Sequence, residues 1–124
     1  MYLGIEAILI GSEDATKLAH FYRDKVGLKL TNEFVMGEDS NGFSFDIGRF
    51  SLNILDHSEI KGSAKEPARI MFNLEVKNIE EAVKKLKDAG VKKITDIYHV
   101  EEYGYIATFA DLDGNYFQIV KTKE

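Results

Sequence analysis

The first amphipathic pattern in the chain covers residues 13–26. Apolar side chains recur there every three or four positions, which is the spacing of one helix face. Ser12 precedes the pattern as a candidate N-cap, and Gly27 follows it at the position where helices commonly end. The sequence therefore predicts a helix over residues 13–26.

A second helical pattern covers residues 79–89. Asn78 and Glu81 have the spacing of a capping box, and Gly90 follows the last apolar position. Acidic residues come early in this segment and lysines come late, as the helix dipole favours. We predict a helix that ends before Gly90.

The other apolar segments follow the pattern of β-strands. Short runs rich in β-branched and aromatic residues are separated by turns that contain Gly, Asn or Asp. The predicted strands are residues 2–10, 28–35, 43–47, 50–55, 68–76, 92–98, 104–110 and 115–121. The polar segment 56–67 holds the only proline and is predicted to be a linker.

The two halves of the chain repeat one order of elements. Alignment of the two helical segments also aligns the glycines that end them, and each half then reads strand, helix and three strands. Residues 1–55 and 68–124 are thus predicted to be two modules of a single domain, 1–124. Two helices for eight strands predict an α+β fold: two tandem βαβββ modules that form curved mixed sheets around a cleft, with the helices outside.

The composition fits one folded domain of 124 residues, with 44% hydrophobic and 30% charged residues. The net charge is −5, and no cluster of lysine and arginine is interleaved with aromatic residues, so nucleic acid is not expected as a partner. Zero cysteines exclude disulfides, thiolate zinc sites and cysteine nucleophiles, and they suit a cytoplasmic location.

The N-terminal residues MYLGIEAILIGSED carry no basic leader. Their apolar run is too short to span a membrane, so it is interpreted as the first strand, and no membrane partner is expected.

Two stretches resemble the vicinal oxygen chelate superfamily, which includes glyoxalases, bleomycin-resistance proteins and extradiol dioxygenases. HFYRDKVGLKL, residues 20–30, is similar to the first helix and turn of that family, and DLDGN, residues 111–115, is similar to its final hairpin. Leu112 departs from the proline usual in that turn. DLDGN does not begin a calcium EF-hand loop, because the sixth and twelfth positions are Tyr116 and Thr122.

The resemblance implies where a metal would bind. Metal-dependent members hold a divalent ion with four side chains, typically His and Glu, and the equivalent positions here are Ala7, Asn53, Met71 and Gln118. Ala7 has no donor atom, Met71 offers a thioether and the other two are neutral amides, so we expect no metal and no cofactor. A slip of one residue would offer Glu6 instead, but it would also turn the neighbouring side chains to the other face.

Strand alternation predicts which residues line the cleft and which pack on the helices. Apolar residues dominate the second set: Ile8, Ile10, Leu52, Ile54, Ile70, Phe72, Leu74, Phe117 and Ile119. The candidate ligand-binding residues form a mixed polar and apolar set, as pockets for small molecules do: Ala7, Leu9, Ser51, Asn53, Arg69, Met71, Asn73, Tyr103, Tyr105, Tyr116 and Gln118.

Several of these residues have a purely structural alternative. Asn53 and Gln118 would also satisfy each other or water, Met71 would serve as core filler, Arg69 would form a surface ion pair, and Tyr116 would cap the barrel.

The segment HVEEYGY, residues 99–105, is predicted to be a loop at the rim of the cleft. Its tyrosines and the acids Glu101 and Glu102 would suit an organic cation, or the segment would pack on a partner subunit. The three histidines show no ligand spacing, and no nucleophile elbow or phosphate loop occurs.

Three functions remain open. The first is a metal-free small-molecule binding protein similar to bleomycin-resistance proteins, which sequesters a drug-like or cationic compound and so confers antibiotic resistance, and which the resemblance implies is a homodimer. The second is a metal-dependent lyase, isomerase or dioxygenase. The third is a non-catalytic module that binds a protein. We favour the first, and do not expect an enzyme.

Overall fold

The computed structural model describes residues 1–37 and 40–123, which divide into two compact units, Met1–Gly62 and Ser63–Glu124. Unit 1 contains β1 (Ala7–Ser12), α1 (Ala15–Phe21), the π-helical turn η1 (Tyr22–Val26), β2 (Leu30–Val35), β3 (Asn41–Ile47) and β4 (Phe50–Asp56). Unit 2 contains β5 (Asn73–Glu75), α2 (Ile79–Asp88), β6 (Lys92–Val100), β7 (Gly104–Ala110) and β8 (Tyr116–Thr122). The predicted α+β class and the two βαβββ modules are confirmed.

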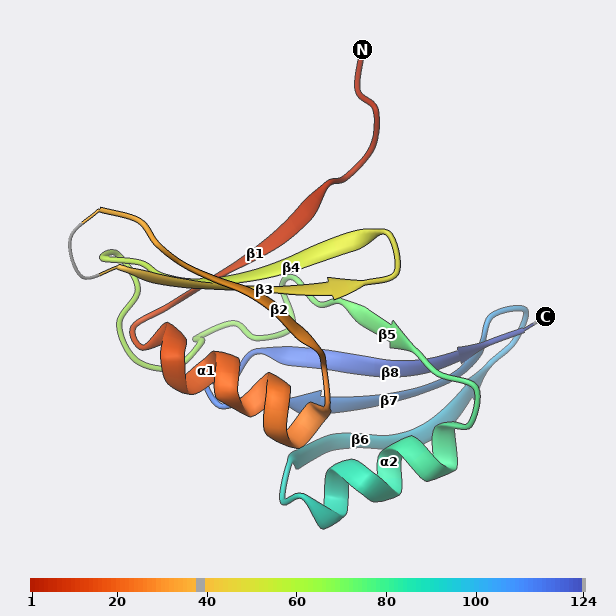
Figure 1. Ribbon diagram of the computed structural model, residues 1–124. Helices are drawn as coiled ribbons and strands as arrows, with labels where there is room; N and C mark the ends of the chain where they lie inside the picture. The colour runs from red at the N-terminus through yellow and green to blue at the C-terminus, as the bar shows by residue number, and fades with distance from the viewer. Residues whose placement is uncertain (38–39, 124) are drawn as a thin grey trace. The chain divides into compact units, whose positions relative to one another are not determined.

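Both sheets have the same topology. The strand order is β1-β4-β3-β2 in unit 1 and β5-β8-β7-β6 in unit 2, so the first strand of each unit pairs with its last (Figure 1). That pairing is parallel in both units, whereas the other neighbours are antiparallel. Each unit therefore forms a four-stranded sheet from its own strands.

One face of each sheet is covered by the helix of the same unit. In unit 1, α1 packs on β3 and β4, and Leu18 and Tyr22 are fully buried with Phe45 and Ile54. In unit 2, α2 packs on β8, β6 and β7, and buries Ile79, Val83 and Leu86. Each such large apolar side chain contributes roughly 1.5–3 kcal/mol to folding. We call the opposite side the helix-free face of each sheet.

The helix termini follow the sequence prediction with one correction. Asn78 caps α2 as expected, because its side-chain oxygen accepts a hydrogen bond from the Glu81 N–H at 3.0 Å. Asp14, not Ser12, caps α1 by accepting from the Lys17 N–H at 3.1 Å. Ser12 Oγ accepts from the Asp14 N–H at 3.0 Å and so holds the turn before the helix.

We expect Asn78→Ala to lower the free energy of unfolding by about 1 kcal/mol, because the substitution leaves an N–H of the first turn of α2 without its acceptor. Asn78→Asp keeps the acceptor and should stay close to the unchanged protein in urea denaturation. Equal loss in both variants would show that the cap contributes nothing.

The fifth strand is much shorter than predicted. Residues 68–76 were expected to be a strand, but β5 covers only Asn73–Glu75, and Ile70 is 81% exposed instead of packing on a helix. The predicted segment begins instead in a turn, in which Pro67 occupies the second position and the Arg69 N–H donates to the Glu66 carbonyl at 3.1 Å.

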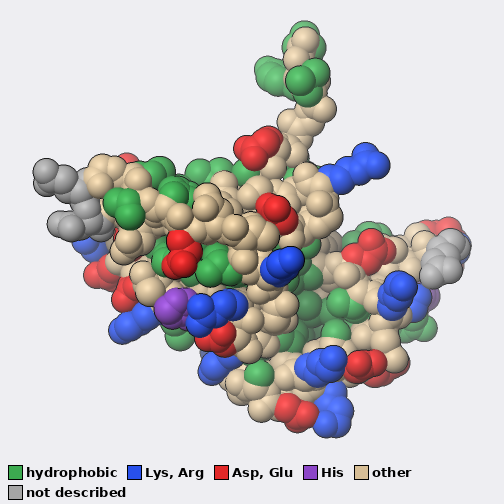
Figure 2. Space-filling view, in the orientation of Figure 1, with side chains coloured by type: hydrophobic (Ala, Val, Ile, Leu, Met, Phe, Trp, Pro, Cys, Tyr) green, Lys and Arg blue, Asp and Glu red, His purple; other side chains and the backbone are tan. Residues whose placement is uncertain are grey.

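The first strand is also shorter than predicted, since it begins at Ala7 and not at residue 2. Its partner β4 starts at Phe50, directly after the two-residue turn that joins it to β3. The Ser51 N–H still donates to the Glu6 carbonyl at 3.2 Å, but residues 1–5 extend past the start of β4. The hydrophobic side chains among residues 1–6 are exposed (Figure 2).

The DLDGN segment forms a turn organised by Asp111, which is buried. Asp111 Oδ1 accepts hydrogen bonds from the N–H groups of Asp113 and Asn115, both 2.9 Å long. Gly114 adopts a positive φ of 83°, and its N–H donates to the Asp111 carbonyl. The turn is therefore explained by backbone geometry and by its own carboxylate.

Candidate functional site

The helix-free face of the unit 1 sheet brings four of the predicted residues together. Ala7 lies beside Ser51 and Leu9 beside Asn53 in the parallel pair of β1 and β4, and paired residues share a face. Ser51 Oγ donates a 2.8 Å hydrogen bond to Asn53 Oδ1. Leu9 is 61% exposed, so this face combines an exposed aliphatic surface with a hydroxyl and an amide.

The helix-free face of the unit 2 sheet carries a second group of amides and hydroxyls. Gln118 lies beside Asn73 on one side and Thr108 on the other. Gln118 Nε2 donates to Thr108 Oγ1 at 3.0 Å, and Asn73 Nδ2 donates to the Tyr103 hydroxyl at 3.0 Å. Tyr116, which is half-buried, shares this face because it lies two residues before Gln118 on β8.

Thr108 is a residue of this face that the sequence analysis missed. It is buried, with 5% of its surface exposed, and it lies directly opposite Gln118 on the neighbouring strand. The sequence could have indicated this position, because Thr108 and Phe109 are consecutive in β7 and so face opposite sides of the sheet. The Thr108 hydroxyl lies on the helix-free side and the Phe109 ring on the helix side.

Three predicted residues do not join these faces. Tyr105 pairs with Lys121. Along β7 and β8 these two residues face the opposite side of the sheet from Thr108 and Gln118, so Tyr105 lies on the helix side. Arg69 lies outside any strand and forms an exposed ion pair with Glu66, with 3.0 Å between Nη2 and Oε2. Met71 also precedes β5 and is 39% exposed.

The segment 99–105 is a tight hairpin and not a rim loop. His99 and Val100 belong to β6, Gly104 begins β7, and the Tyr103 N–H donates to the Val100 carbonyl across the turn at 3.0 Å. The antiparallel pairing of His99 with Tyr105 continues the ladder up to the turn, which leaves little chain to act as a loop.

The residues that the resemblance assigns to the metal-binding positions, Ala7, Asn53, Met71 and Gln118, lack the donor atoms that a divalent ion prefers. They remain a methyl group, a thioether and two amides, and one oxygen or nitrogen of each amide is already hydrogen-bonded to a hydroxyl. Among residues 1–37 and 40–123, no three His, Asp or Glu side chains gather as a metal site would require.

A polar hollow of about 340 Å³ beside the start of α1 contains carboxylates with structural partners. Asp56 accepts hydrogen bonds from the N–H groups of Ala15, at 2.8 Å, and Asn41, at 2.9 Å. Glu13 accepts from the Gly62 N–H at 2.8 Å. These acids connect loops within unit 1.

Shifted pKa values on the surface have equally plain causes. The pKa of Asp24 is lowered chiefly because the carboxylate accepts a hydrogen bond from Arg23. The pKa of Lys84 is raised chiefly because its ammonium donates a hydrogen bond to Asp88. Both pairs lie on the surface, and exposed ion pairs of this kind are common structural features.

The family model of the Glyoxalase/Bleomycin resistance protein/Dioxygenase superfamily matches residues 4–119. The chain therefore belongs to this superfamily, and the resemblance seen in the sequence is confirmed. A comparison with curated proteins gave no significant match.

Several solved structures share the fold over nearly the whole chain. TnmS3, an antibiotic binding protein from Streptomyces sp. CB03234, is 18% identical with a TM-score of 0.79, and the match covers 98% of each chain. UcmS2 is 20% identical with a TM-score of 0.80, covering 98% of this chain and 100% of its own. The fosfomycin resistance protein FosX from Listeria monocytogenes is 16% identical with a TM-score of 0.76, covering 99% and 96% respectively.

In the part of the chain that the structure describes, neither helix has the length and apolar character needed to cross a bilayer.

Proposed function

We propose that this protein binds a small organic molecule on the helix-free face of a sheet, without a metal, and releases it chemically unchanged. The observation that carries the proposal is the pair of hydrogen-bonded amides, Asn53 and Gln118, at two positions to which the resemblance assigns metal ligands in metal-dependent members. A neutral amide held by a neighbouring hydroxyl recognises polar groups of a ligand, whereas it is a poor donor to a hard or borderline cation.

The hydrogen bonds leave defined groups for a ligand. Ser51 engages the oxygen of Asn53, and Thr108 engages the nitrogen of Gln118. Within the described residues, the Asn53 nitrogen and the Gln118 oxygen have no hydrogen bond to another side chain. The face of unit 1 therefore offers a donor, and the face of unit 2 offers an acceptor.

The charge and aromatic character of these faces favour a cationic compound. On unit 2, Glu75 follows Asn73 on the same face, where Thr122 Oγ1 donates to its carboxylate. Tyr98 pairs with Ile106 on that face and is 43% exposed. On unit 1, the exposed Asp46 lies beside Ser51. Carboxylates and phenol rings are the groups that bind organic cations.

The fold also supports the binding of a small molecule, because TnmS3, which shares this architecture, is an antibiotic binding protein. We further expect a homodimer, as the resemblance implies, and a role in sequestering an antibiotic or a similar compound.

The test is thermal denaturation in parallel samples with and without EDTA, using ethidium as a cationic aromatic probe. A ligand that binds only the folded protein raises the Tm, so we expect a concentration-dependent increase. Glu75→Gln and Gln118→Met should reduce that increase, while Glu59→Gln, an identical charge change on an exposed loop of unit 1, should not. An increase that disappears with EDTA, or that all three variants share, would contradict the proposal.

Native mass spectrometry of freshly purified protein provides the second measurement. We expect dimer mass without stoichiometric metal. Near-stoichiometric iron, manganese, nickel or zinc would instead support a metal-dependent enzyme, and a monomer would contradict the expected assembly.

A further inference from the structure

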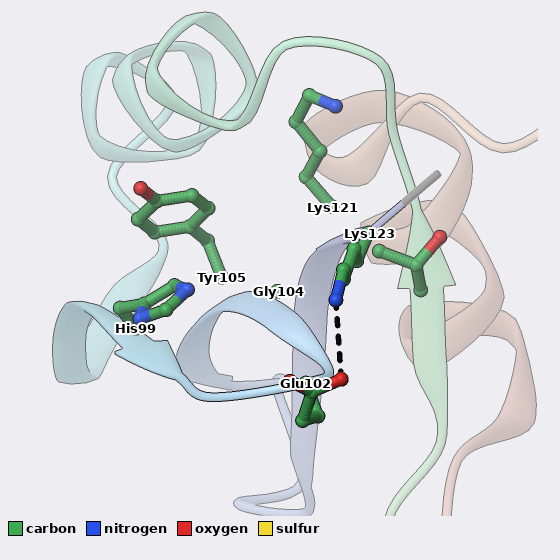
Figure 3. A pocket seen from close by; sticks show the side chains of 7 residues that line it. His99, Glu102, Gly104, Tyr105, Lys121 and Lys123 are labelled. Carbon is green, nitrogen blue, oxygen red and sulfur yellow. Dashed lines mark hydrogen bonds and ion pairs between the residues drawn. The ribbon is translucent and has the colours of Figure 1, made fainter.

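A hollow of about 340 Å³ lies at the end of the β6–β7 hairpin, where it meets β8 (Figure 3). His99, Tyr105 and Lys121 come from three neighbouring strands, since His99 pairs with Tyr105 and Tyr105 pairs with Lys121. All three therefore lie on one face of the sheet. The hollow is a surface feature of unit 2 alone.

This face is the helix side of the sheet and not the helix-free face. Lys121 alternates with Val120 and Thr122 along β8, and it lies on the same side as Phe117 and Ile119. The Gln118 amide points to the other side. The hollow thus lies on the other face from Asn73 and Gln118, although Thr122, which donates to Glu75, also lines it. The inference below does not depend on the proposed function.

The hollow combines an aromatic wall with an unpaired ammonium. The rings of His99 and Tyr105 lie 4.9 Å apart between centroids with 50° between their planes, and 45% of Tyr105 is exposed. Two lysines line the hollow, and Lys123 is neutralised by Glu102 at 3.1 Å. Lys121 forms no ion pair or hydrogen bond with any described side chain. A local excess of positive charge therefore exists on a chain whose net charge is −5.

The backbone around the hollow is held in place by short contacts. The Lys123 N–H donates to the Tyr103 carbonyl at 2.7 Å, and the Lys123–Glu102 pair spans the same turn (Figure 3). Gly104 brings β7 so close to β8 that an added Cβ would lie 2.1 Å from the Lys121 carbonyl oxygen. A site formed before the ligand arrives loses less ordering entropy on binding.

We infer that this hollow binds a small, flat organic anion. Its carboxylate would accept a hydrogen bond from the Lys121 ammonium, and its ring would contact Tyr105 and His99. The charge-assisted hydrogen bond supplies the specificity for an anion, and the aromatic contact supplies the preference for a ring.

The experiment is an NMR titration of the ¹⁵N-labelled full chain with 2-naphthoate. We expect the amide resonances of Gly104, Tyr105 and Lys121 to shift in a saturable manner. Lys121→Gln should weaken binding about tenfold, as expected for the loss of one charge-assisted hydrogen bond, and Lys121→Arg should retain most of it. Tyr105→Leu should weaken binding about threefold.

Three controls make the result decisive. Lys25→Gln removes the same charge from an exposed position of unit 1 and should not change the affinity. The neutral analogue 2-naphthamide and the ringless anion phosphate should both bind more weakly than 2-naphthoate. The inference is overturned if Lys25→Gln weakens binding as much as Lys121→Gln does, if either analogue binds as well, or if no resonance near the hollow shifts. Unchanged spectra elsewhere in Lys121→Gln would show that the variant is folded.

Discussion

Replacing Gly104 with alanine is expected to lower the free energy of unfolding by more than about 3 kcal/mol. An added Cβ would lie 2.1 Å from the Lys121 carbonyl oxygen, which is backbone and cannot rotate away. The φ of 138° at Gly104 is also a conformation that side chains with a Cβ rarely adopt. The strand pair β7–β8 must separate locally to accommodate the methyl group. Urea denaturation followed by circular dichroism measures the loss.

Gly48→Ala is the matched control, because Gly48 has a φ of 60° but nothing within 4 Å of an added Cβ. It carries the cost of backbone strain without the collision, about 1 kcal/mol. The interpretation fails if the two variants lose the same stability.

Phe117→Ala is expected to destabilise the protein by about 3–5 kcal/mol. Phe117 is fully buried, and its ring is stacked between those of Phe72 and Phe109, with 6.1 Å between centroids on each side. Removing the ring leaves a cavity between two aromatic side chains held by separate parts of the unit. The midpoint of chemical denaturation should fall accordingly.

Leu112→Ala serves as the comparison within the same hairpin. Leu112 is 54% exposed, so its truncation should cost less than about 1 kcal/mol. A Phe117→Ala variant with a loss equally small would show that the aromatic stack contributes little to the core of unit 2.

Periodicity in the sequence was sufficient to predict the elements that have a strong apolar pattern. The helix over 79–89 is observed as α2, Ile79–Asp88, with its cap at Asn78, because a complete amphipathic repeat and a capping side chain act together there. The segment 68–76 lacked this agreement. Its apolar residues suggested a strand, but the local turn that begins at Pro67 determined the backbone up to Arg69.

The candidate site was predictable to the extent that strand alternation determines it. Alternation placed Asn53 and Gln118 on the side away from the buried Ile54 and Phe117, and the structure agrees. It did not place Tyr105, because residue 105 was assigned both to the predicted strand 104–110 and to the predicted rim loop 99–105. The partners of the amides, Ser51 and Thr108, depend on register between strands, which a single strand does not reveal.

The parallel pairing of first and last strands has a consequence for biosynthesis. Ala7 pairs with Ser51, so β1 leaves the ribosome long before β4 exists to receive it. Until then its apolar residues have no ladder partner, and α1 can form only as an isolated helix, which is marginal at this length. The first unit therefore acquires its native structure late in its own translation, after residue 56 has emerged.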